Sequence, residues 1–132
     1  MSDQSVALVR RGWEHFQATG EPPVELMAPD FVWDMSTFRG WPEQPRYHGA
    51  DGMREFLSDW SSAFEEWTIA VESMHDAGDN VVCVCRQHGR ARTTGVAVDM
   101  RLALVFTVRD GLQTQMRMYA EPDEAFAAAG QE

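Results

Sequence analysis

Two long segments of alternating apolar and polar residues, joined by a tight turn, constrain the fold more than any other feature. They span residues 98–109 and 112–120. A period of two is typical of β-strands whose two faces have different surroundings. Asp110-Gly111 between them is typical of a hairpin turn. We therefore predict a long antiparallel hairpin that can form one wall of a deep pocket, followed by a short helix over residues 122–129.

The first part of the chain predicts helices. Apolar side chains recur at helical spacing from Val6 to Phe16, and Gly20 ends this run. A later apolar stripe from Met53 to Phe64 predicts another helix, which begins near residue 49. The other predicted elements are a short helix at 21–27, a strand at 31–35, a loop at 36–47, and strands at 67–75 and 81–92.

Helices that precede an antiparallel meander predict an α+β fold, in which the helices cover a curved sheet. We expect a single domain over residues 1–132, because a chain of this size can bury a sizeable core. Five tryptophans and eight methionines are many for this length. Bulky rings and flexible thioethers suit the lining of an apolar cavity, and they equally suit an aromatic-rich core.

The charge of the chain disfavours two classes of partner. The formal net charge is −10, so no excess of basic side chains is available for nucleic-acid phosphates or an anionic membrane. No segment has the length of a transmembrane helix, and the first residues lack the apolar run of a signal peptide. We therefore expect a cytoplasmic protein with no nucleic-acid or membrane partner.

The cysteine pattern implies neither a disulfide nor a metal site. Cys83 and Cys85 would point to the same side of a strand about 7 Å apart, which is long for a relaxed disulfide. Two thiols without further ligands at suitable spacing make no zinc site, and no Gly-rich phosphate loop follows a strand. We expect no cofactor, and any chemistry would be proton transfer on a bound organic molecule.

Several segments together resemble the SnoaL-like family of the nuclear transport factor 2-like superfamily. Residues 47–56 (YHGADGMREF) are similar to the start of that family's third helix, and residues 29–33 to its first strand. Residues 109–111 and 119–125 resemble its last hairpin and tail. The resemblance covers nearly the whole chain. It implies a cone-shaped, curved antiparallel or mixed sheet wrapped around three helices of the N-terminal half, an internal apolar pocket, and pairing as a homodimer through the sheet.

The resemblance also implies which side chains face the pocket. Side chains alternate along each strand, so Leu104 and Met118 would face inward. Trp33 would do the same on the first strand, whereas Asp34 would face outward unless a bulge reverses it. The residues expected to bind a ligand are Trp13, Trp33, Met35, Trp60, Leu102, Leu104, Phe106, Met116 and Met118.

The catalytic positions of well-known members are not kept. The resembled ketosteroid isomerases use a carboxylate base, a tyrosine and a protonated acid. This chain aligns Met35, Trp13 and Leu104 there, and none of these side chains transfers a proton. The resembled epoxide hydrolases use an Arg-x-Asp pair and a distal aspartate, to which residues 86–88 (RQH) and Met118 correspond. Neither mechanism is therefore expected in its known form.

Arg86 and His88 remain as the candidate catalytic pair. They lie two apart on the predicted strand 81–92, so both would face one substrate on the side of Val82 and Val84. A histidine with a pKa near about 6.5 can exchange a proton at neutral pH. An arginine beside it can hold an oxyanion or a carboxylate and disfavours protonation of the imidazole. The alternative is a pair at the rim, solvated or bridged to acidic side chains.

Our first interpretation is a cofactor-independent enzyme that isomerises, cyclises or dehydrates a hydrophobic, carbonyl-containing molecule. One alternative is a non-catalytic ligand-binding protein. Another is a dimeric interaction module with a vestigial pocket, filled by Trp33 and Trp41. The back of the sheet would form the dimer interface, with Cys83, Cys85, Arg101, Val105, Thr107, Arg117 and Tyr119.

Overall fold

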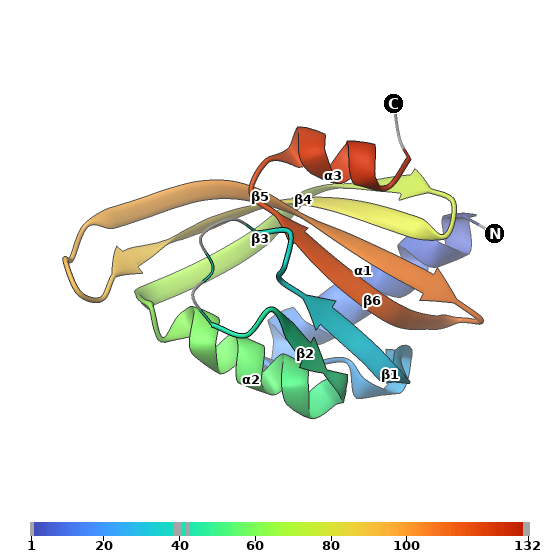
Figure 1. The fold of residues 1–132 in the computed structure, drawn as a ribbon, viewed down its shortest axis with the longest axis horizontal. Coiled ribbons are helices and arrows are strands. Elements are labelled where there is room, and N and C mark those ends of the chain that lie inside the picture. The colour runs from blue at the N-terminus through green and yellow to red at the C-terminus, as the bar shows by residue number, and fades with distance from the viewer. Residues whose placement is uncertain (1, 39–40, 42, 131–132) are drawn as a thin grey trace.

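The structure is a computed structural model that describes residues 2–38, 41 and 43–130. It contains helices and strands in the order expected of an α+β fold (Figure 1). In chain order they are α1 (Ser2–Thr19), a 3-10 turn η1 (Val24–Leu26), β1 (Met27–Asp34), β2 (Arg46–His48), α2 (Gly49–Ser61), β3 (Phe64–Ala77), β4 (Asn80–Ala91), β5 (Ala97–Arg109), β6 (Leu112–Tyr119) and α3 (Pro122–Ala128).

The strands form one curved, mixed sheet in the order β2-β1-β6-β5-β4-β3 (Figure 1). β1 runs parallel to β6, and the other neighbouring pairs are antiparallel. β2 and β3 are the two edge strands and do not pair with each other in the described part of the chain, so the sheet remains open. The predicted hairpin is confirmed as β5 and β6, joined at Asp110-Gly111.

Helices cover both faces of the sheet. We call the face under α1 and α2 the inner face, and the face under α3 the outer face (Figure 1). The larger core lies at the inner face, where Val9 of α1, Phe56 of α2 and Leu104 of β5 are buried together. A smaller core lies under α3 and includes Ala125 and Val105. The inner core is the one that can contain a cavity.

The predicted helix at 21–27 is wrong. Only residues 24–26 form a 3-10 turn, because Met27 already pairs with Gln113 as the first residue of β1. β1 therefore begins well before Phe31, and a register shift between Met27 and Val32 accommodates Pro29, which has no N–H for the ladder. The N-terminal half thus holds α1, the 3-10 turn η1 and α2, and a further helix, α3, lies near the C-terminal end. The predicted α+β fold with helices on a curved, mixed sheet is confirmed.

Two further boundaries differ from the prediction. The short strand β2 overlaps the end of the segment predicted as a loop, and it pairs Tyr47 with Trp33. α2 ends at Ser61, so Phe64 belongs to β3 rather than to the helix, although its ring still lies 6.0 Å from that of Trp60. None of the described helices has the length and apolarity needed to cross a bilayer.

Candidate ligand-binding cavity

A narrow cavity lies in the inner core between the sheet, α1 and α2. Its volume is about 50 Å³, and its lining is almost wholly apolar. Side chains from both helices and four strands contribute, so the cavity exists only in the assembled fold. The lining residues are Val9, Gly12, Trp13, Phe16, Pro23, Trp33, Met53, Phe56, Leu57, Trp60, Trp67, Ile69, Leu102, Leu104, Phe106, Gln113 and Met118.

Most of the residues expected to bind a ligand do border this cavity. They are Trp13, Trp33, Trp60, Leu102, Leu104, Phe106 and Met118. Met35 and Met116 do not line it, but both are fully buried in the same core. Phe16, Trp67 and Gln113 also line the cavity. The sequence did not identify them as ligand-binding residues, because no local pattern shows that their side chains face the cavity.

The predicted inward orientation of Arg86 and His88 is wrong. Residues that pair across antiparallel strands share one face of the sheet. Leu104 and Leu102, which line the cavity, pair with Cys83 and Cys85, so the two thiols face inward. Val82, Val84, Arg86 and His88 therefore lie on the outer face. The sequence of β4 does not show which of its residues face inward, because residues 81–85 are all apolar and all buried.

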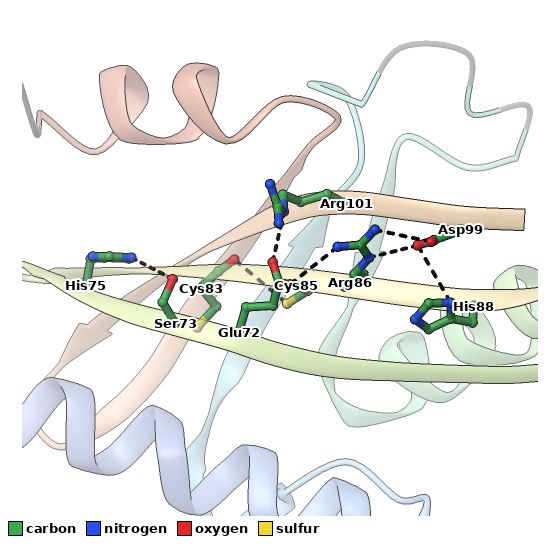
Figure 2. A network of polar contacts seen from close by, with 9 residues as sticks. All are labelled: Glu72, Ser73, His75, Cys83, Cys85, Arg86, His88, Asp99 and Arg101. Atoms are coloured by element: carbon green, nitrogen blue, oxygen red, sulfur yellow. Dashed lines mark hydrogen bonds and ion pairs between the residues drawn. The ribbon is translucent and has the colours of Figure 1, made fainter.

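Arg86 and His88 instead take part in an exposed ion-pair network on the outer face (Figure 2). Arg86 Nε lies 2.8 Å from Asp99 Oδ1, and His88 Nδ1 lies 3.6 Å from the same oxygen. Glu72 joins the network through Arg101 at 2.8 Å and Arg86 at 3.8 Å. The hydrogen bond from Arg86 lowers the pKa of the Asp99 carboxyl. This arrangement corresponds to the alternative of a solvated pair bridged to acidic residues.

Gln87, between those two residues, is the polar side chain of β4 that faces inward. It is fully buried, and its Oε1 accepts hydrogen bonds from Trp60 Nε1 at 3.0 Å and from Trp67 Nε1 at 2.6 Å. Its Nε2 donates to the sulfur of Met100 at 3.3 Å. Because indole nitrogens only donate, this network also fixes which end of the amide carries the oxygen.

One residue of the lining, Trp33, has a buried donor without a partner. The indole Nε1 of Trp33 is buried and makes no hydrogen bond among the described residues. Leaving such a group unpaired costs about 1–3 kcal/mol. The polar groups of the lining are otherwise the amide of Gln113 and the indole nitrogens, and no ionisable side chain belongs to the described lining. The arrangement suits an apolar molecule that offers a hydrogen-bond acceptor.

Comparison with known proteins settles the family. Residues 7–116 match the family described as SnoaL-like domain. The chain belongs to the SnoaL-like domain family. No curated protein matches the sequence. The resemblance found in the sequence motifs is therefore confirmed at the level of the family.

Solved structures of SnoaL-like and NTF2-like proteins share the fold. An NTF2-like protein of Burkholderia thailandensis E264 is 24 % identical with a TM-score of 0.76, over 97 % of this chain and 98 % of its own. A protein of Jannaschia sp. CCS1, named for its likeness to SnoaL-like polyketide cyclases, is 23 % identical with a TM-score of 0.70, over 99 % and 94 %. TerC, co-crystallised with polyporic acid, is 17 % identical with a TM-score of 0.70, over 97 % and 99 %.

Asp34 does not reach the cavity of this SnoaL-like chain. The register shift in β1 lies before Val32, so Trp33 faces inward and Asp34 faces outward. Its carboxylate accepts a hydrogen bond from the backbone N–H of Ser36 at 2.8 Å and lies 3.6 Å from Arg46. A bulge that would turn this carboxylate inward is therefore not present.

The surface predicted for dimerisation of this SnoaL-like chain is partly internal. Cys83 and Cys85 are free thiols buried in the inner core, and their sulfur atoms point toward α1 rather than toward the outer face (Figure 2). Val105 and Tyr119 lie on the outer face but are buried in the core under α3. Arg101 remains exposed. Association as a dimer stays a prediction.

Trp41 packs against the outside of the cavity wall. Its ring centroid lies 5.2 Å from that of Trp60 and 5.6 Å from that of Phe56, and it does not line the cavity. Trp33 borders the cavity without filling it. The interaction module with a vestigial pocket stays a prediction.

Proposed function

We propose that the inner cavity binds a small, largely apolar organic molecule that carries a hydrogen-bond acceptor, such as a ketone oxygen. Two observations carry this proposal: the cavity has an almost wholly apolar lining, and Trp33, a residue of that lining, has a buried indole Nε1–H without a partner. We expect this donor to reach a bound molecule. A carbonyl oxygen would satisfy that donor, while the rest of the molecule would be buried against leucine, phenylalanine and methionine side chains. The co-crystallisation of TerC, a structural neighbour, with polyporic acid is in keeping with small-molecule binding in this fold.

The cavity must widen to accept a whole molecule. An engineered cavity of about 150 Å³ accommodates benzene, whereas this one measures about 50 Å³. Met53 and Met118 border it and are the most adaptable side chains of the lining. We expect rotation of these two thioethers to provide the missing space, which would make binding weak but saturable.

The lining supports ligand binding better than proton transfer. Isomerisation, cyclisation or dehydration requires a group that can accept and donate a proton. No described residue of the lining has an ionisable side chain. The catalytic role predicted for Arg86 and His88 would need a substrate at the outer face of the sheet, where both side chains are exposed. We therefore assign binding to the cavity and no reaction to that pair.

A matched pair of probes tests this assignment. Acetophenone and α-methylstyrene have nearly the same shape, but only acetophenone has an acceptor oxygen. We expect the wild-type protein to bind acetophenone about three- to tenfold more tightly, in line with one net hydrogen bond. Trp33→Phe keeps an aromatic ring without the donor and should abolish this preference. Quenching of tryptophan fluorescence reports binding, since four tryptophans line the cavity.

His88→Ala is the control for this experiment. His88 lies on the outer face, so we expect the affinities for both probes to stay within twofold of the wild type. Equal affinity of the wild-type protein for the two probes would contradict the proposed role of Trp33. Loss of binding in His88→Ala would indicate that the probes bind at the outer face instead of in the inner cavity.

A further inference from the structure

We infer that Gln87 is a positioning residue that determines which ligands the cavity accepts, by holding two tryptophans of its wall in one arrangement. The inference rests on the proposed function, because it concerns the selectivity of the same cavity. Gln87 does not line the cavity itself. Its amide oxygen is the shared acceptor for Trp60 of α2 and Trp67 of β3, which both do.

The two tryptophans come from different elements of the fold. Trp60 lies near the end of α2, and Trp67 lies near the start of edge strand β3. Gln87 lies on the neighbouring strand β4, opposite Ile69 on one side and Met100 on the other. One buried amide therefore connects a helix, an edge strand and the middle of the sheet at a single point.

The backbone of β3 is distorted where it delivers Trp67 to this acceptor. The pairing of β3 with β4 shifts register between Glu65 and Thr68, and Glu66 has a φ of 55°. A positive φ is unfavourable for a residue other than glycine, and a bulge of this kind re-aims the next side chain. The distortion places Trp67 on the inner face, where it is half-buried and reaches Gln87.

The consequences of losing the amide differ for the two rings. Trp60 is buried and packs against Phe56, Phe38 and Trp41, so its position is fixed by neighbours on several sides. Trp67 is only half-buried and lies on an edge strand, where it packs against the inner core from one side, so we expect the hydrogen bond to Gln87 to restrain its position strongly. Without that bond Trp67 can move outward, and the cavity widens at the β3 side.

Two variants isolate the acceptor oxygen. Gln87→Met has nearly the same size but no acceptor for the indoles, whereas Gln87→Glu keeps an oxygen at the same position. We expect Gln87→Met to increase the affinity for 2-acetonaphthone relative to acetophenone by about tenfold, since the larger ketone needs the wider cavity. Gln87→Glu should keep the ratio of the wild type. Trp67→Phe removes one donor while leaving Gln87 in place, and it should shift the ratio in the same direction as Gln87→Met.

Exchange of the indole N–H protons provides a readout that does not depend on a ligand. We expect the Nε1 protons of Trp60 and Trp67 to exchange with solvent about tenfold faster in Gln87→Met, and at nearly the wild-type rate in Gln87→Glu. Faster exchange with an unchanged ketone ratio would overturn the role in selectivity. Unchanged exchange would overturn the positioning role itself. If neither ketone binds the wild-type protein, the proposed function fails, and the exchange rates still decide whether Gln87 positions the two rings.

Discussion

Between pH 9 and about pH 11 the free energy of unfolding is expected to fall by at least about 2 kcal/mol, because the buried thiol of Cys85 resists ionisation in the folded state, and the buried thiol of Cys83 should add to this fall. Burial raises the pKa of Cys85 from 9.0 to about 12 and that of Cys83 well above the same starting value. Well below pH 9 both thiols are protonated in the folded and the unfolded chain, so their contribution to stability is fully present. As the pH rises further, the unfolded chain releases protons that the folded chain retains, and stability is lost.

Tyr47 should add to this loss above pH 10. Burial, and then the hydrogen bond to Asp59, raises its pKa from 10.0 to about 12. The chain contains no lysine, so few other side chains titrate in this range. Urea unfolding at pH 8, 9, 10 and 11 under reducing conditions measures the effect. The double variant Cys83→Ala/Cys85→Ala should have a much flatter profile, and an equally steep decline in that variant would show that the thiols are not responsible.

Phe56→Ala is expected to lower the free energy of unfolding by about 3–5 kcal/mol, the usual cost of removing a fully packed phenylalanine. Phe56 is 2 % exposed. Its ring lies 4.5 Å from that of Trp33 and 5.6 Å from that of Tyr47, and it also contacts Trp41 and Trp60. The change therefore removes the ring that connects β1, β2 and α2. Chemical denaturation at neutral pH measures the loss.

Phe16→Ala is the matched control for this prediction. Phe16 also lines the cavity, but it is only half-buried and has Trp13 as its aromatic neighbour, at 5.7 Å. We expect it to cost clearly less than Phe56→Ala, because less of its surface leaves water on folding. Equal losses for the two variants would contradict the central position that the structure gives to Phe56.

The sequence predicted the fold well where local pattern and tertiary packing agree. The β5–β6 hairpin has two long strands joined by a turn dipeptide, so its existence follows from the sequence. Its phase was predicted from the family resemblance, because residues 102–106 of β5 are all apolar and all buried. The helix predicted at 21–27 forms only as a 3-10 turn, because Met27 pairs with Gln113 in the sheet. No local pattern reveals this pairing with a distant residue. β2 was missed since three residues between prolines and a helix show no strand signal of their own.

The sequence predicted most of the apolar side chains that border the cavity, but it did not predict the polar side chains correctly. The inward orientation of Trp33, Leu104 and Met118 was predicted from the family resemblance together with strand alternation, and all three border the cavity. β4 is covered on both faces, by the inner core and by α3, so its apolar run carries no information about phase. A polar pair on that strand, Arg86 and His88, was therefore placed on the wrong face, and Gln87 was missed.

The most direct test of the central claim locates a bound ketone by NMR. Protein labelled at methionine and valine methyl groups would be titrated with acetophenone, and nuclear Overhauser contacts to the probe recorded. We predict contacts to the methyl groups of Met53 and Met118, which border the inner cavity, and none to Val84 or Val105 on the outer face. Contacts confined to the outer-face valines, or no saturable contact at either face, would contradict the account.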